Sequence, residues 1–140
     1  MTYIYPACFY QEEDGYSVVF PDLNYLATDG NTLEAAMNNA VDCLAGVLYE
    51  EEREKQAHAV PSDITELDPL KVYLELDPEG FHGNCFTSMV SVDLTAYAKE
   101  HFEKSVKKTL TIPAWLNRLA LEHHVNFSKV LQDALIDMLL

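Results

Sequence analysis

The sequence predicts an α+β protein, in which a small sheet packs on one long helix and is followed by a module of one strand and two helices. Three observations support this class. Two aromatic and β-branched runs near the start flank a polar turn, and a stretch of about twenty residues repeats its apolar side chains at helical spacing. The last third of the chain differs from the rest in charge. We therefore expect two domains, over residues 1–98 and 99–140.

A β-hairpin is predicted at the start of the chain. Residues 2–9 and 16–20 are its strands, because the polar run between them ends in Gly15, and residues 25–28 are a plausible short third strand. Pro6 has no N–H to donate, so we expect the first strand to lie at an edge or a bulge at that point.

A helix is predicted next, over about residues 32–55. Asn31 and Glu34 have the spacing of a capping box, and an apolar stripe follows them. The acidic end of this helix has no apolar face and should project into solvent. The remaining expectations for the first domain are a loop over 57–69, half-buried strands over 70–76 and 86–92, and a connector helix over 94–102 capped by Asp93.

The final module is predicted from residues 104–112, which alternate apolar and polar side chains with Lys108 as the exception. Pro113 ends the strand and suits the first turn of a helix over about 114–124, and Asn126 can cap a second helix with a clean apolar stripe. A lone strand of this length cannot pair its backbone, so the module predicts a homodimer. The residues expected at the dimer interface are Leu110, Ile112, Trp115, Leu131 and Leu135.

This module resembles the ribbon-helix-helix repressors, in which two strands pair and enter the major groove of DNA. In such a ribbon Lys107, Thr109 and Thr111 face outward and would meet base edges, with Lys104 adding positive charge. The resemblance implies that Asn126 and Ser128 lie at a phosphate. The alternative is an edge strand and helical hairpin used only for dimerisation.

Charge divides the chain in the same place. Residues 1–98 hold three basic and eighteen acidic side chains, a net charge of −15, whereas residues 99–140 have a net charge of +1. We expect the first domain to attract a basic partner, with acidity for solubility as the alternative. No run of 18 apolar residues and no charged leader occurs, so we expect a cytoplasmic protein without a membrane partner. The odd, scattered cysteines indicate reduced thiols.

Several motifs resemble the HicB antitoxin family, and they occur in the family's order over nearly the whole chain. They are Tyr5-Pro-Ala7, Glu13-Asp-Gly-Tyr-Ser-Val18, Phe20-Pro-Asp-Leu23, Asp29-Gly-Asn-Thr-Leu-Glu-Ala-Ala36, Val90-Ser-Val-Asp-Leu94 and Thr111-Ile-Pro-Ala-Trp-Leu116. Asn24-Tyr-Leu26 departs from the family, which commonly has a Pro-Gly-Cys-like turn there.

The resemblance implies a partial RNase H-like fold for residues 1–98 that inhibits a HicA-like toxin, a small basic ribonuclease. Asp22, Tyr25 and Leu26 are the expected toxin contacts. It further implies that a homodimer or higher oligomer binds operator DNA and represses the toxin and antitoxin genes. Two alternatives are a ligand-sensing ribbon-helix-helix repressor and an interaction module that never touches DNA.

An RNase H-like fold raises the question of catalysis, which would need several carboxylates around metal ions. Asp14, Asp22, Glu34 and Asp42 are candidates by residue type only. The segment from His82 to Cys85 and the pair His123-His124 do not form a set of zinc ligands, since adjacent histidines on a helix diverge. No phosphate-binding loop or nucleophile motif is present, so we expect no enzyme activity, no metal and no cofactor.

Overall fold

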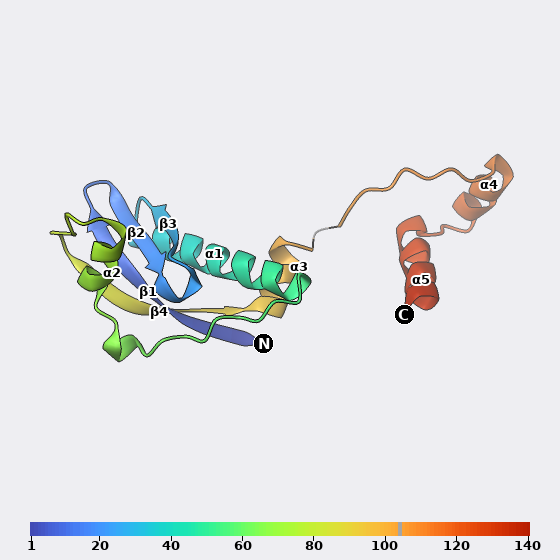
Figure 1. The fold of residues 1–140 in the computed structure, drawn as a ribbon. Helices are drawn as coiled ribbons and strands as arrows, with labels where there is room; N and C mark the ends of the chain where they lie inside the picture. Colours follow the sequence, from blue (N-terminus) through green and yellow to red (C-terminus); the bar gives the residue numbers. More distant parts are fainter. Residues whose placement is uncertain (104) are drawn as a thin grey trace. The chain divides into compact units, whose positions relative to one another are not determined.

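The computed structural model describes residues 1–103 and 105–140, and within these it contains one antiparallel sheet with a helix on each face (Figure 1). The strands are β1 (Thr2–Glu12), β2 (Gly15–Phe20), β3 (Leu26–Gly30) and β4 (Cys85–Asp93), in the order β3-β2-β1-β4. The long helix α1 (Leu33–Arg53) packs on one face, and the short helix α2 (Pro69–Leu76) packs on the other. The predicted α+β class is confirmed.

The chain forms two compact units, one that ends at residue 104 and one over Ser105–Leu140. Lys104, a predicted DNA contact, lies outside the described residues. No helix in the described part of the chain combines the length and the apolar composition that crossing a membrane requires.

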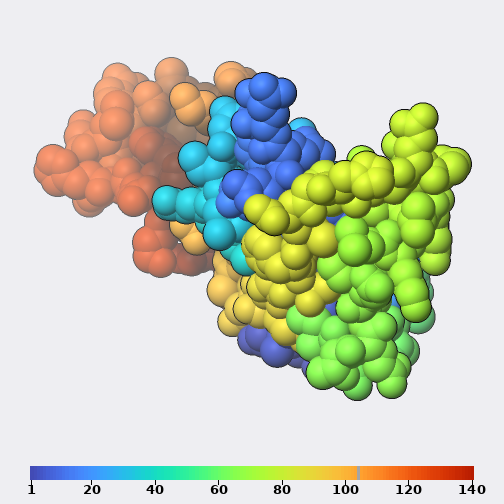
Figure 2. Space-filling model, turned by 90° about the vertical axis from the view of Figure 1, so that its left-hand side faces the viewer, coloured from blue at the N-terminus to red at the C-terminus, as the bar shows by residue number. Residues whose placement is uncertain are grey.

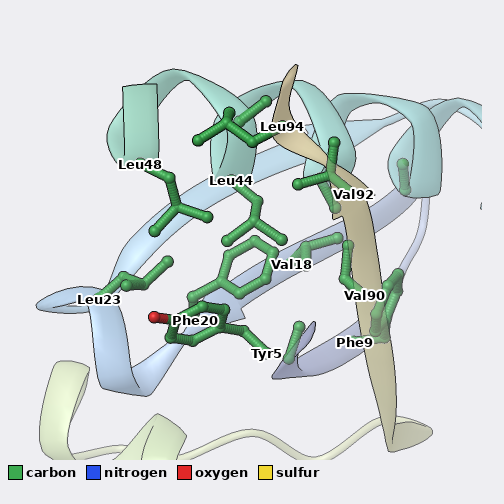
Figure 3. Close-up of a cluster of buried hydrophobic side chains, with 14 residues drawn as sticks. Tyr5, Phe9, Val18, Phe20, Leu23, Leu44, Leu48, Val90, Val92 and Leu94 are labelled. Atoms are coloured by element: carbon green, nitrogen blue, oxygen red, sulfur yellow. The ribbon is translucent and has the colours of Figure 1, made fainter. Parts of the chain in front are cut away.

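The main core lies between the sheet and α1. Alternation along β1 turns Tyr5, Ala7 and Phe9 toward this helix, and turns Cys8 and Tyr10 toward α2. Figure 3 shows the α1 side chains of this core above those of the strands. Full burial of each large apolar side chain contributes about 1.5–3 kcal/mol, so this interface is the main source of stability in the first unit.

The first strand is longer than predicted and lies inside the sheet. It pairs with β2 from Cys8 to Glu12 and with β4 from Thr2 to Tyr10. The β1–β2 pairing ends at Cys8 and Val19, so Pro6 has no β2 partner, and β1 is unpaired on the β2 side at the proline. The expectation of a local edge at Pro6 is confirmed, although β1 is an inner strand elsewhere.

The predicted strand over residues 70–76 is wrong, because these residues form the helix α2. Asp68 caps it by accepting a hydrogen bond from the Leu70 amide at 3.0 Å, and Pro69 occupies the first turn. The place beside β1 is taken by β4. A loop with one short 3₁₀ turn, Ile64–Glu66, precedes the helix.

Both ends of α1 differ from expectation. Its N-cap is Thr32 and not Asn31, since the Thr32 hydroxyl accepts a hydrogen bond from the Ala35 amide at 3.1 Å. Its acidic end does not simply project into solvent. Glu51 and Glu52 lie 3.4 and 3.3 Å from the two ring nitrogens of His58, which holds the following loop against the helix.

The predicted connector helix is α3 (Leu94–His101), and it packs within the first unit. Asp93 caps it as expected, accepting from the Ala96 amide at 3.3 Å. Ala98 is buried, and the Tyr97 hydroxyl donates to Asp42 of α1 at 2.8 Å. Burial and this hydrogen bond raise the pKa of Tyr97 to about 12, so the phenol stays neutral and keeps α3 on α1.

The second unit contains α4 (Ala114–Glu122) and α5 (Phe127–Leu139). Asn126 caps α5 as predicted, accepting from the Lys129 amide at 3.1 Å. Residues 105–113 carry no strand in the single chain. A strand is defined by its hydrogen-bonded neighbour, so the predicted pairing with a second copy stays a prediction.

Candidate functional site

The second unit presents an unusually apolar surface for a single chain. None of its described side chains is buried, although α5 alone has seven apolar residues on its predicted stripe. Of the five residues predicted at a dimer interface, four are exposed and Leu131 is half-buried. The exposed ones are Leu110 (63%), Ile112 (41%), Trp115 (62%) and Leu135 (44%). Contiguous exposed apolar surfaces are typical of sites of protein association.

The predicted DNA-reading residues lie on the extended segment before α4. Lys107, Thr109 and Thr111 are all exposed and make no side-chain hydrogen bond among the described residues. Asn126 uses its side-chain oxygen for the cap of α5, which leaves its amide N–H₂ group free to donate. Ser128 is exposed in the first turn of that helix, where backbone amides favour an anion.

In the first unit, Asp22 holds a loop in place. Its carboxylate accepts hydrogen bonds from both the backbone amide of Ser62, at 2.8 Å, and the Ser62 hydroxyl. Nearby, the Tyr5 hydroxyl donates to the Ala59 carbonyl at 2.5 Å. Asp22, a predicted toxin contact, therefore joins the segment after β2 to the loop between α1 and α2.

Tyr25 and Leu26, the other two predicted toxin contacts, point to opposite faces of the sheet. Asn24 and Tyr25 both have left-handed backbone conformations, with φ of 57° and 59°, which for residues other than glycine cost about 1–2 kcal/mol each. The Tyr25 hydroxyl hydrogen-bonds to Glu75 of α2, whereas Leu26 packs against the core under α1. The structure does not bring Asp22, Tyr25 and Leu26 together at one surface.

The four candidate carboxylates are also dispersed. Asp14 lies in the β1–β2 turn, Asp22 bonds Ser62, Glu34 is exposed at the start of α1, and Asp42 accepts from Tyr97. Over residues 1–103 and 105–140, no three His, Cys, Asp or Glu side chains come together in a way that could hold a metal ion. These four carboxylates therefore do not come together as a two-metal site would require.

Two open hollows occur in the first unit. One is lined by the β1–β2 turn and Asn31, and the other lies beside Asp22, between the end of β2, α1 and the loop at His58. The lining of the first is mainly polar and charged, whereas much of the lining of the second is apolar. Both hollows are open to solvent, unlike the enclosed sites that are typical of small-molecule ligands.

Solved structures identify the protein family. Over 99% of both chains, this chain is 34% identical, with a TM-score of 0.66, to a chain of a toxin–antitoxin complex from Streptococcus pneumoniae. The chain belongs to the family of this toxin–antitoxin component. It also shares the fold of the antitoxin HicB from Burkholderia pseudomallei, at 19% identity and a TM-score of 0.51, again over 99% of both chains. The first likeness indicates a component of a toxin–antitoxin system, and the second shows a shared fold.

Other comparisons add little about function. A protein of Haemophilus phage HP1, described as an uncharacterised 14.9 kDa protein in the rep–hol intergenic region, is 29% identical over 117 residues. That match covers 81% of this chain and 75% of the phage protein. No family model matches the chain.

One exposed surface of the first unit was missed by sequence reasoning. The sequence predicts a strand for Leu70 and Leu74, on which they would be two of four alternating residues. In the helix that forms, their four-residue spacing puts them on one face. The signal was present, since Asp68-Pro69 is a typical helix start. Both leucines are exposed, at 45% and 51%.

Proposed function

We propose that this chain is an antitoxin that binds and neutralises a HicA-like, mRNA-cleaving ribonuclease toxin and represses its own operon as a ribbon-helix-helix dimer. Residues 1–98 would bind the toxin, and residues 99–140 would dimerise and bind DNA. The observation that carries the proposal is the 34% identity, over nearly the whole chain, to a component of a toxin–antitoxin complex.

The charge of the first domain supports the toxin-binding half of the proposal. Its net charge of −15 is complementary to a basic ribonuclease whose own partner, RNA, is a polyanion. An acidic protein that covers the toxin's RNA-binding face would exclude RNA both sterically and electrostatically. Neutralisation needs no enzyme activity in the antitoxin, which agrees with the dispersed carboxylates.

The apolar surface of the second unit supports the dimer. Pairing of residues 105–112 from two copies would satisfy their backbone groups and cover Leu110 and Ile112, with Trp115 at the start of α4 beside them. The same pairing would place Lys107, Thr109 and Thr111 from each copy on the outer side of a two-stranded ribbon, which fits the major groove.

Toxin binding is expected to assist DNA binding. The first domain carries many negative charges that repel phosphates, while the second domain is nearly neutral. A bound basic toxin would cancel part of that repulsion, so operator affinity should rise when the toxin binds, most clearly at low salt. Equal or weaker operator binding by the complex across a salt titration would contradict this part of the mechanism.

Co-expression tests the toxin-binding half. The basic protein encoded by the neighbouring reading frame should arrest growth when expressed alone. Co-expression of this chain should restore growth, and the two proteins should co-purify. The proposal fails if the neighbour arrests growth and this chain neither restores growth nor co-purifies with it.

Substitutions in the extended segment test the DNA-binding half. Lys107→Ala and Thr109→Ala should weaken operator binding and leave the dimer intact. Lys55→Ala is the control, because it removes the same charge from an exposed position of the first domain, outside this segment. If both variants kept wild-type affinity and sequence preference, this segment would not be the reader of the operator.

A further inference from the structure

The outer face of α2 is an apolar surface with no partner among the described residues of the first unit. Val72 is the buried residue of this helix and packs with Cys8 and Tyr10 on the sheet. At 100° per residue, Leu70 and Leu74 lie about 40° from each other and about 160° from Val72, so they point away from the sheet. Figure 2 shows this segment, in green, at the surface beside β4 in yellow.

Acidic residues flank these two leucines in the sequence. Residues 66–79 contain five acidic side chains and one basic side chain, Lys71, which is exposed. The acidic residues are Glu66, Asp68, Glu75, Asp77 and Glu79. None of them forms an ion pair with a lysine or arginine among the described residues. Their negative charge is therefore uncompensated within the unit.

The surface is held rigidly. The Tyr10 hydroxyl donates to the Pro69 carbonyl at 2.6 Å, and burial raises the pKa of this phenol, which keeps it protonated. The rings of Tyr10, Tyr73 and Phe81 pack with centroids 5.0–5.1 Å apart beneath the helix. A preformed surface of this kind loses little conformational entropy when it binds.

The segment after α2 fixes part of the acidic rim. Asp77 accepts a hydrogen bond from the Glu79 amide at 3.0 Å, and its own backbone amide closes the helix by donating to the Tyr73 carbonyl at 2.9 Å. Gly80, with φ of +76°, packs so closely that a Cβ there would lie 3.1 Å from the Leu74 side chain. Gly80 therefore packs against Leu74 at the end of this acidic segment.

We infer that this α2 face, made of Leu70, Leu74 and the acidic residues around them, binds a basic protein that offers an apolar contact ringed by lysine or arginine. The inference rests on the proposed function, under which that protein is the toxin. A second copy of this chain is a poorer occupant, since it would bring two faces of net charge −4 together.

The inference is tested with the full-length chain and the basic protein from the neighbouring reading frame, by calorimetry at physiological salt. Leu70→Lys with Leu74→Lys should weaken binding by at least about 100-fold, because central apolar contacts dominate such interfaces and the new charges repel a basic partner. Leu33→Lys is the matched control. Leu33 is an exposed leucine (43%) at the start of α1, outside this surface, and its replacement should change affinity by less than about threefold.

A second variant changes only charge and leaves both leucines in place. Glu66→Gln with Glu79→Gln should slow association and flatten its dependence on salt. Over residues 1–103 and 105–140, neither side chain forms a hydrogen bond or caps a helix, so the fold should be unaffected. The inference requires slower association in this charge variant even if the Leu70→Lys, Leu74→Lys variant fails to fold.

The outcomes separate the inference from the proposed function. If the wild-type chain does not bind the basic neighbour, the proposed function fails and the inference fails with it. If the wild-type chain binds and the folded leucine variant binds equally well, only the inference is overturned. Loss of binding in Met89→Lys, on the exposed face of β4, with no loss in the leucine variant, would place the interface on the sheet instead.

Discussion

Replacement of Asp22 by alanine should release the loop between α1 and α2. The substitution removes the acceptor of both hydrogen bonds from Ser62. Hydrogen bonds to a charged group contribute about 1.5–3 kcal/mol each when buried, but Ser62 is exposed, so we expect the free energy of unfolding to fall by about 1–2 kcal/mol in total. For a unit of about 100 residues this is a fall in Tm of roughly 5–10 °C.

Amide hydrogen exchange provides the local measurement for the same variant. The Ser62 amide should lose its protection in Asp22→Ala, and thermal unfolding should show the lower Tm. Asp14→Ala is the control, because it removes the same charge from an exposed turn without breaking a side-chain hydrogen bond. Wild-type exchange at Ser62 together with loss of toxin binding would refute this reasoning and make Asp22 a direct partner contact.

Three further predictions concern the core, a helix cap and the dimer. Leu44→Ala should lower the free energy of unfolding by about 2–5 kcal/mol in a denaturant titration, whereas Leu33→Ala should cost less than about 1 kcal/mol; similar losses would contradict the assigned core. The hydrogen bond from the Ala96 amide, followed by the charge of the N-terminus, lowers the pKa of Asp93. This carboxylate therefore stabilises the fold above its unfolded pKa of about 3.9, and the contribution is lost as pH falls through the lower folded pKa. An NMR titration midpoint of Asp93 at or above that of free aspartate would be inconsistent with the cap. Trp115 is the only tryptophan and is 62% exposed in the single chain. Its fluorescence emission should therefore shift to the blue as the protein concentration rises and the dimer forms. Emission that does not change with concentration, together with a monomer in sedimentation, would exclude the dimer.

Elements whose signals are local were predictable from the sequence. Alternation and a glycine-terminated turn located the hairpin, and a long apolar stripe located α1. Asp93 and Asn126 were recognised as caps because a helix cap depends on a side chain and an amide only a few residues apart. The division of charge between the two parts of the chain also follows from the sequence alone.

The candidate surfaces were harder to predict, because they depend on which face of each element is covered. Tyr25 and Leu26 are neighbours in sequence and contact opposite faces of the sheet, as successive residues of an extended chain do, so they do not share one surface. Asp22 was predicted as a toxin contact, whereas in the structure its carboxylate accepts hydrogen bonds from Ser62, forty residues later. Sequence patterns do not reveal contacts between residues that lie so far apart in the chain.

Local periodicity and composition are enough to predict the α+β class, the long helix, the two C-terminal helices and an acidic domain followed by a nearly neutral one. Residues 70–76 depend also on distant parts of the chain. Their alternating apolar residues suit a strand or a short helix, the local cap at Asp68 favours the helix, and β4 occupies the edge of β1 that a strand there would need. That choice turns Leu70 and Leu74 outward among acidic side chains, and so creates the surface to which we assign the basic partner.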